Sequence, residues 1–126
     1  MPPGSAMGLR VGQRLRRNAD FRATREQGRR LDCGAFLLTW RTRGGPAGQP
    51  ARVGVVASRA AVGDAVRRNR AKRRLRELFR RHQQQMPPDL DLVLTARRAL
   101  NRLAFAELER RFAVACQRLT PPAANV

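Results

Sequence analysis

The stretch that determines the fold is AVRRNRAKRRLRELFRR, which spans residues 65–81. More than half of these residues are Arg or Lys. At about 100° per residue, the few apolar residues gather within one arc of a helix. This arc contains Ala71, Leu75, Leu78, Phe79 and His82. We therefore predict one helix whose narrow apolar face packs on a core and whose other faces are basic.

The basic faces of this helix indicate a polyanionic partner. Nearly opposite the apolar arc lie Asn69, Arg73, Arg76 and Arg80, and a flank beside it contains Arg67, Arg70, Arg74 and Arg81. Like charges four residues apart destabilise an isolated helix by roughly 0.2–0.5 kcal/mol per pair. A solvated face usually alternates both signs of charge, whereas only Glu77 interrupts this one. Bound phosphate would relieve the repulsion, and the planar fork of arginine suits phosphate oxygens.

Shorter elements flank the basic helix on both sides. Strands are predicted at residues 34–42, 52–58 and 90–96, and helices at residues 18–28 and 105–119. Asn18 is the expected N-cap of the first helix, and Gly28 is its expected left-handed stop. The order α-β-β-α-β-α predicts a small α+β sandwich with helices packed against a central sheet. Parallel pairing of the strands around the basic helix would make a βαβ crossover, which general rules make right-handed.

The first predicted strand has two different faces. Phe36, Leu38 and Trp40 lie on one face, and Leu37, Thr39 and Arg41 lie on the other. Aromatic side chains on a sheet can stack on single-stranded RNA, which is one interpretation of Phe36 and Trp40. Core packing is favoured, because these aromatic residues share their face with an aliphatic residue.

Length and charge limit the domain organisation and the partner. The 126 residues suffice for one domain, predicted at residues 14–119 between disordered tails at 1–13 and 120–126. Lys and Arg number 27 against 9 Asp and Glu, a formal net charge of +18. Nucleic acid is the favoured partner, because arginines release counterions from closely spaced phosphates. An apolar run of about 20 residues and a signal peptide are both lacking, so we expect no membrane partner and a cytoplasmic location.

Residues that could carry chemistry are few and scattered. His82 is the single histidine, and its place in the apolar arc favours a structural role. Asp89 and Asp91 come closest to a carboxylate pair, and their position before a strand suggests turn chemistry or edge solvation. Cys33 and Cys116 lack the spacing of a metal site, which predicts two free thiols. We therefore expect no catalytic and no metal-binding residue, and chemistry that lies in a partner.

The order of residues within the basic helix carries a family resemblance. An Arg-Asn-Arg triplet at residues 68–70 is followed by Lys72 and Arg73 and then by Arg76 and Glu77. Together with RLRRNADF at residues 14–21 and LTARRALNRLAFAEL at residues 94–108, this pattern resembles the protein component of bacterial ribonuclease P.

This resemblance implies the small basic subunit of a ribonucleoprotein enzyme, which binds a catalytic RNA and removes the 5′ leader from precursor tRNA. It implies that the RNA subunit and the substrate hold the catalytic magnesium ions, and that the protein alone is not catalytic. No obligate protein partner is expected. The implied fold is ribosomal protein S5 domain 2-like, with a left-handed βαβ crossover at the basic helix in place of the right-handed one.

The resemblance also assigns candidate site residues. The candidate RNA-binding residues are Arg59, Arg67, Arg68, Asn69, Arg70, Lys72, Arg73, Arg76 and Arg80. A cleft for the leader would lie between the first helix and the exposed face of the sheet, with Phe21, Arg25, Leu37 and Thr39 as its candidate residues. Arg25 and Thr39 replace the Phe and Tyr that are common in relatives, and Ala60 follows Arg59 where relatives carry paired Lys. We therefore expect the leader to be held with more charge and less stacking.

Two other classes of function remain open at this point. A structural RNA-binding protein, such as a ribosomal protein or an RNA chaperone, would carry a similar charge, although the ordered triplet favours the ribonuclease subunit. Binding of duplex DNA is less favoured, because a helix with arginines all round lacks a defined set of base-reading residues.

Overall fold

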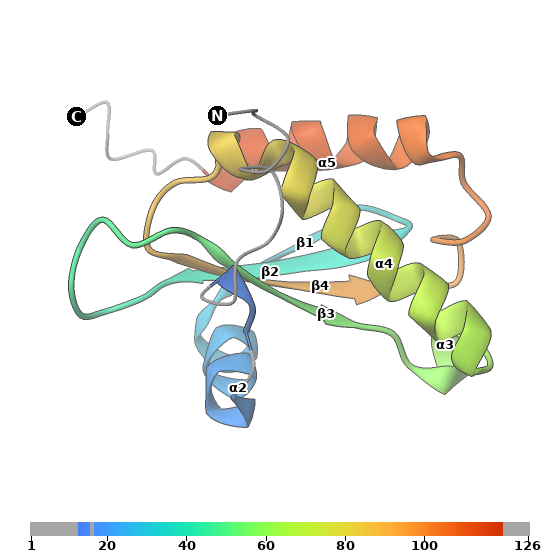
Figure 1. Cartoon of the computed structure of the whole chain (residues 1–126), viewed down its shortest axis with the longest axis horizontal. Coiled ribbons are helices and arrows are strands. Elements are labelled where there is room, and N and C mark those ends of the chain that lie inside the picture. The colour runs from blue at the N-terminus through green and yellow to red at the C-terminus, as the bar shows by residue number, and fades with distance from the viewer. Residues whose placement is uncertain (1–12, 16, 120–126) are drawn as a thin grey trace, which may run out of the picture.

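The structure is a computed structural model that describes residues 13–15 and 17–119, and it forms the predicted α+β sandwich (Figure 1). Apart from Gln13, the two predicted tails lie outside the described residues. Gln13 is buried, and its side-chain amide donates to Gln83 Oε1 at 2.9 Å. The backbone amide of Leu15 donates to the Val53 carbonyl at 2.9 Å. Packing of the domain therefore already includes Gln13, one residue earlier than predicted.

The described chain runs through one helix, three strands, two helices, a fourth strand and a last helix. The helices are α2 (Asn18–Gln27), α3 (Arg59–Val62), α4 (Ala65–His82) and α5 (Phe105–Leu119), with a 3-10 turn at Gln83–Gln85. The strands are β1 (Arg29–Asp32), β2 (Phe36–Thr42), β3 (Arg52–Val56) and β4 (Leu90–Ala96). They form one sheet of order β1-β2-β4-β3, in which β3 and β4 are parallel and the other pairs antiparallel. Helix α4 thus connects two adjacent parallel strands, as predicted for the basic helix.

The two faces of the sheet carry different helices. Helices α4 and α5 cover one face, and α2 lies on the other (Figure 1). Phe36 and Leu38 of β2 are fully buried on the α4 and α5 side, where the ring centroids of Phe36 and Phe112 are 6.1 Å apart. Trp40 is partly buried against the same cluster. The predicted division of β2 into two faces is confirmed, and its aromatic residues belong to the core.

Helix α4 has the predicted length and the predicted buried face. Its N-terminus is capped by Asp64, whose Oδ1 accepts a hydrogen bond from the Arg67 amide at 3.0 Å. The fully buried residues of the helix are Ala71, Leu75, Leu78 and Phe79. His82 ends the same face, with its ring centroid 5.5 Å from that of Phe112. Among the described residues, no helix is long and apolar enough to cross a membrane.

Strand β1 is an element that the sequence pattern does not predict. Its sequence is RRLD, in which Leu31 alone is partly buried and the other three residues are exposed. The strand is held by antiparallel pairing with β2, from Arg29 opposite Trp40 to Asp32 opposite Leu37. Charged residues are common on edge strands because they discourage pairing with other chains. They also remove the apolar alternation by which a strand is detected.

The ends of α2 differ from the prediction. Asn18 is the first helical residue, and Arg17 occupies the N-cap position without a side-chain hydrogen bond. Gly28 has φ of −85° and ψ of 171°, so the predicted left-handed stop is wrong and the chain extends directly into β1. A glycine is required here for another reason, because a Cβ would overlap the carbonyl oxygens of Thr24 and Trp40.

Two predicted strands are shorter than expected. The strand predicted at residues 34–42 begins at Phe36, because Gly34 has φ of 83° in the turn after β1. The strand predicted at residues 52–58 ends at Val56. Ser58 instead caps the short helix α3, and its Oγ accepts a hydrogen bond from the Ala61 amide at 3.1 Å.

Candidate RNA interface

The predicted RNA-binding residues of α4 are divided between two flanks of the helix. The Asn69 flank lines a pocket of about 410 Å³, whose residues are Arg14, Asn69, Arg73, Arg76, Glu77 and Arg80. The Arg67 flank lines a second pocket, of about 790 Å³, which brings Arg67 and Arg70 together with Arg59. Arg68 and Lys72 are half-buried and line neither of these pockets. The structure thus separates residues that the sequence pattern presents as one basic helix.

A carboxylate partner distinguishes some cations of α4 from the others. Glu77 accepts hydrogen bonds from Arg80 and from Arg81, and these bonds, that from Arg80 first, lower the pKa of Glu77 to about 2. Among the described residues, several cations have no Asp or Glu oxygen within 4.0 Å. They are Arg59, Arg67, Arg68, Arg70, Lys72, Arg73 and Arg76. These side chains remain available for phosphate oxygens.

Like charges accumulate on the Asn69 flank. The pKa of Arg76 is lowered, chiefly by burial and further by the charge of the neighbouring Arg14. Arg14 comes from the N-terminal segment that runs beside β3, where it forms a bridge with Val53. A bound anion would relieve this repulsion, because it adds an opposite charge between cations that the fold brings together.

The face of the sheet beneath α2 is arranged as three rungs across β2, β4 and β3. From one end of the face to the other, the rungs are Leu37–Thr95–Val56, Thr39–Val93–Gly54 and Arg41–Asp91–Arg52. Every residue of the first rung is partly exposed, and every residue of the second is buried. In the third rung, Arg41 and Arg52 form ion pairs with Asp91 and cover it. This face is therefore open to a ligand mainly at the first rung.

The predicted leader-cleft residues occupy different depths on this face. Phe21 of α2 is partly exposed and lies over Gly54, Arg25 is exposed, and Leu37 belongs to the open rung. Thr39 is only 3 % exposed, so it offers a ligand almost no surface. Thr95 and Val56 line the open rung beside Leu37, although the sequence did not indicate them. Only the strand register could have identified them, because they come from two other strands.

Asp91 is the centre of a buried arginine network, so its predicted role in turn chemistry or edge solvation is wrong. Arg52 donates to its carboxylate from Nε and Nη2, each at 2.8 Å, and Arg43 donates from Nη1 at 2.7 Å. Asp20 of α2 lies 4.0 Å from Arg41 and 3.7 Å from Arg52, which ties α2 to the sheet. Asp91 is buried because Arg41 of β2 and Arg52 of β3 flank it on this face of the sheet.

The other candidate chemical groups have structural surroundings. Asp89 has φ of 63°, and its carboxylate accepts hydrogen bonds from the amides of Gly48 and Gln49, which confirms turn chemistry. These two backbone hydrogen bonds lower the pKa of Asp89. Cys33 and Cys116 are free thiols, as predicted. Within residues 13–15 and 17–119, no three His, Cys, Asp or Glu side chains gather as a metal site would require.

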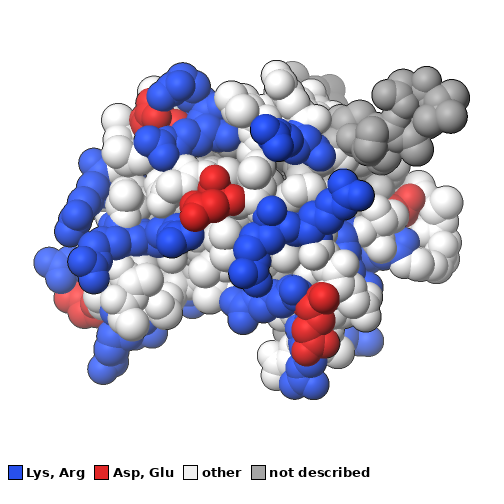
Figure 2. Space-filling view, turned by 180° about the vertical axis from the view of Figure 1, so that it is seen from behind, with Lys and Arg blue, Asp and Glu red and all other residues white. Residues whose placement is uncertain are grey.

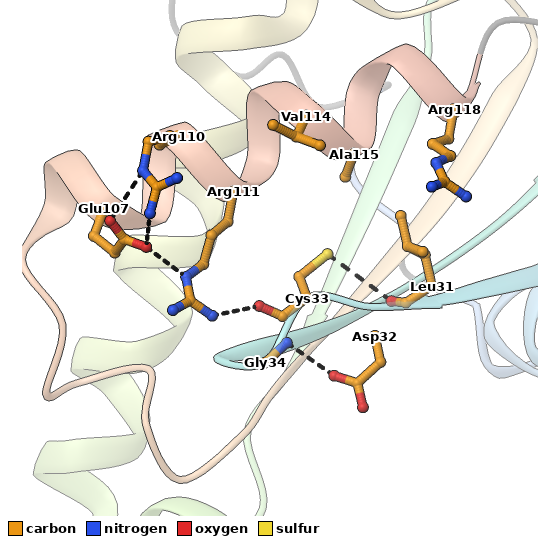
Figure 3. A pocket seen from close by; sticks show the side chains of 10 residues that line it. All are labelled: Leu31, Asp32, Cys33, Gly34, Glu107, Arg110, Arg111, Val114, Ala115 and Arg118. Carbon is orange, nitrogen blue, oxygen red and sulfur yellow. Dashed lines mark hydrogen bonds and ion pairs between the residues drawn. The ribbon is translucent and has the colours of Figure 1, made fainter.

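A further pocket, of about 520 Å³, lies between the β1–β2 turn and α5 (Figure 3). Arg111 joins the two elements, because it donates to the Cys33 carbonyl and to the Glu107 carboxylate, each at 2.9 Å. Asp32 accepts a hydrogen bond from the Gly34 amide at 2.8 Å and so closes the turn. None of the predicted RNA-binding or cleft residues lines this pocket.

Positive charge also extends beyond α4. Figure 2 shows the molecule from behind, with Lys and Arg side chains spread over this face and acidic side chains as isolated spots between them. A polyanion would therefore meet a positive potential from several directions, and the unpaired cations of α4 would determine where it binds.

Together, the fold and the site define a small basic α+β protein with a partly exposed strip of sheet. On both flanks of α4 it has arginines without a carboxylate partner among the described residues, which suits a polyanionic ligand. Comparison with known proteins identifies the family, since the ribonuclease P family model matches residues 9–120. The ribonuclease P protein component of a Nocardioides species is 42 % identical over 102 residues, which cover 81 % of this chain and 86 % of that relative. The component of Desulfovibrio desulfuricans is 44 % identical over 85 residues, which cover 68 % of this chain and 64 % of that relative.

A solved structure agrees with these sequence matches. The ribonuclease P protein of Thermotoga maritima matches with a TM-score of 0.73 and 29 % identity, over 86 % of this chain and 98 % of that chain. The chain therefore belongs to the ribonuclease P protein family, the protein components of a ribonucleoprotein that processes the 5′ end of tRNA. The resemblance found in the sequence and the predicted fold class are confirmed.

Proposed function

We propose that this chain binds the catalytic RNA of ribonuclease P and the 5′ leader of precursor tRNA, and that it assists removal of the leader. The observation that carries this proposal is the pair of basic flanks on α4, because Arg67, Arg70, Arg73 and Arg76 have no carboxylate partner among the described residues. Arginine forks without an internal anion are suited to bidentate bonds with phosphate oxygens.

The open rung of the sheet supports the leader-binding part of the proposal. Leu37 and Val56 present partly exposed apolar side chains on either side of Thr95, and Phe21 offers an aromatic edge beside them. Arg25 is exposed on the same helix as Phe21 and can reach the phosphates of a strand that lies along this face. A single strand would then be held by apolar contact and charge together.

The chemical step is proposed to lie in the RNA subunit. The described residues do not fit a magnesium site, because no three His, Cys, Asp or Glu side chains gather among them, and arginines engage the carboxylates of Asp91, Glu77 and Glu107. His82 packs on Phe112 at the edge of the core, and its Nε2 lies 3.5 Å from a single carboxylate, that of Glu109. Magnesium is therefore proposed to bind the RNA subunit and the substrate, with the protein supplying contacts that favour the folded complex.

No obligate protein partner is expected, because the basic surfaces suit RNA. The cytoplasmic location inferred from the sequence remains a prediction.

Reconstitution tests the proposed function. The full chain is combined with the cognate catalytic RNA at low magnesium concentration, and release of the leader from precursor tRNA is measured with and without protein. We expect the protein to stimulate cleavage, with no cleavage by the protein alone. Binding of the RNA without any stimulation would support a structural RNA-binding protein instead, and preference for duplex DNA over precursor tRNA at fixed salt would contradict both.

A further inference from the structure

The larger pocket beside α4 is built from three separate segments of the chain. Helix α3 and the start of α4 form one wall, and the turn between β4 and α5 forms the other. This turn, residues 97–103, contributes Arg98, Asn101 and Arg102. These three residues lie within residues 94–108, which carry part of the family resemblance, but they are not among the predicted RNA-binding residues.

The charges that line this pocket are all positive. The lining arginines are Arg59, Arg67, Arg70, Arg98 and Arg102, and no Asp or Glu lines the pocket. The nearest acidic residue in sequence, Asp64, is engaged as the cap of α4 through the Arg67 amide. Neither Arg98 nor Arg102 forms an ion pair with another described residue. The pocket therefore collects positive charge that the protein itself does not neutralise.

The turn is attached to α4 by hydrogen bonds from two side chains. Arg74 donates from Nη1 to the Leu100 carbonyl at 2.5 Å and from Nη2 to the Leu103 carbonyl at 2.6 Å. Asn101 donates from Nδ2 to the Arg67 carbonyl at 3.1 Å. Arg74 of the Arg67 flank is thus engaged by the turn, and it holds the second wall of the pocket in place. The pKa of Arg74 is lowered, first by burial and then by the charge of Arg70.

The lining of the pocket indicates which feature of a nucleic acid it can recognise. Apart from the arginines and Asn101, it consists of Ala60, Ala61, Val62, Gly63 and Val66, without an aromatic residue. Single strands are usually held by bases stacked on aromatic side chains. Folded RNA is bound largely through its phosphates and ribose hydroxyls. A concave arginine cluster without a stacking surface therefore suits the backbone of folded RNA.

We propose that this pocket is a binding site for the phosphate backbone of the catalytic RNA, with Arg98 and Arg102 as RNA-contacting residues and Arg74 as a positioning residue. The inference rests on the proposed function, and it assigns the two flanks of α4 different tasks. The Arg67 flank and the turn bind the folded RNA subunit. The Asn69 flank, together with Arg14 beside β3, binds the precursor tRNA.

The test compares two double variants of the full chain with the same loss of charge. The first is Arg98→Gln with Arg102→Gln, and the control is Arg110→Gln with Arg118→Gln, two exposed arginines on α5. Affinity for the catalytic RNA without substrate is measured across a range of salt concentrations. We expect the first variant to lose about tenfold in affinity. The slope of log affinity against log salt concentration should become less steep by roughly 1.4–1.8 for two lost phosphate contacts, while the control keeps the wild-type slope.

A second measurement separates the RNA partners. The reconstituted enzyme is assayed for its preference for precursor tRNA over mature tRNA, which reports the leader contact. We expect this preference to stay at the wild-type value in the Arg98 and Arg102 variant. The assignment of this pocket to the catalytic RNA would be overturned if the Arg98 and Arg102 variant bound that RNA with the wild-type salt slope. It would also be overturned if the variant lost only its preference for precursor tRNA over mature tRNA. Failure of the wild-type chain to bind the catalytic RNA would instead refute the proposed function.

A separate variant tests whether Arg74 positions the turn that carries Arg98 and Arg102. Arg74→Lys keeps the charge but loses the fork that reaches two carbonyls. We expect the folded variant to bind the catalytic RNA several-fold more weakly, with a reduced salt slope, because the turn no longer holds Arg98 and Arg102. A variant that unfolds more easily but binds with wild-type affinity and slope would show that Arg74 serves stability alone.

Discussion

The ring of Phe21 lies directly over Gly54, in the space that a side chain at position 54 would occupy. A Cβ on Gly54 would overlap two ring carbons of Phe21, and it would also crowd the Cβ of Leu15. Gly54 belongs to the buried middle rung of the sheet face, opposite Val93 of β4. The missing side chain thus lets α2 lie close to the sheet.

Replacing Gly54 by Ala should push α2 away from the sheet. We expect a loss of about 1–3 kcal/mol in the free energy of unfolding, the usual cost of overpacking a filled site. Urea unfolding followed by Trp40 fluorescence would measure it. Gly44→Ala is the matched control, because nothing lies within 4 Å of a Cβ there. Equal stability of the two variants would contradict the packing of Phe21 on Gly54.

Neutralising Asp91 should be among the most damaging single changes. Asp91→Asn keeps the shape of the side chain but leaves Arg43 and Arg52 without their carboxylate. We expect a loss of about 3 kcal/mol or more in the free energy of unfolding, because the carboxylate is fully buried. Asp32→Asn removes an exposed ion pair with Arg97 and should cost only about 0–1 kcal/mol. A small effect at Asp91 would show that its arginines reach water.

Removing an unpaired arginine of the Asn69 flank should change the salt dependence of RNA binding. Arg73 lines the pocket of this flank and has no carboxylate partner among the described residues. For Arg73→Ala, or for Arg76→Ala, we expect weaker binding of precursor tRNA and a log-log salt slope lower by roughly 0.7–0.9 per lost phosphate contact. The control is Arg110→Ala, whose arginine is paired with Glu107. An unchanged slope would mean that the substituted arginine does not touch phosphate.

The ion pairs of Glu77 should give α4 an acid-sensitive contribution to stability. Hydrogen bonds from Arg80 and Arg81 lower the pKa of Glu77 from 4.5 to about 2. A carboxyl group with a lowered pKa stabilises the fold above its unfolded-state pKa, and this contribution is lost as the pH falls from about 4.5 towards 2. The difference in unfolding free energy between wild type and Glu77→Gln should therefore shrink over this range. In an Arg80→Gln, Arg81→Gln background, we expect no such pH dependence from Glu77.

The two thiols should react slowly in the folded protein. Burial raises the pKa of Cys33 to about 11 and that of Cys116 to about 12, so the reactive thiolate is scarce at neutral pH. Alkylation followed by mass spectrometry at pH 8 should label neither residue quickly in the native state and both in urea. Rapid native labelling of Cys116 would show that α5 opens from the core.

The features that the sequence could predict are those that depend on neighbours along the chain. The buried face of α4 follows from residues three and four positions apart, because a helix places them on one side. The two faces of β2 follow in the same way from the two-residue alternation of a strand. The motif from Arg68 to Glu77 also lies within one helix, so the family resemblance was present in the order of residues alone.

Features that join distant segments could not be predicted in this way. Strand β1 has little apolar alternation of its own, and its pairing with β2 alone makes it a strand. The buried position of Asp91 depends on which strands become the neighbours of β4. Thr95 and Val56 reach the open rung through the register of two other strands.

By itself, the sequence determined a small basic α+β domain of the ribonuclease P protein family, because charge, periodicity and motif order are properties of the chain. Only the tertiary structure decided which arginines remain free for RNA. Arg43 and Arg52 are neutralised by Asp91, and Arg74 is bound to carbonyls of the turn at residues 97–103. Neutralisation acts over a few ångströms of space, whatever the separation in sequence, so identical side chains become structural in one place and available to a ligand in another.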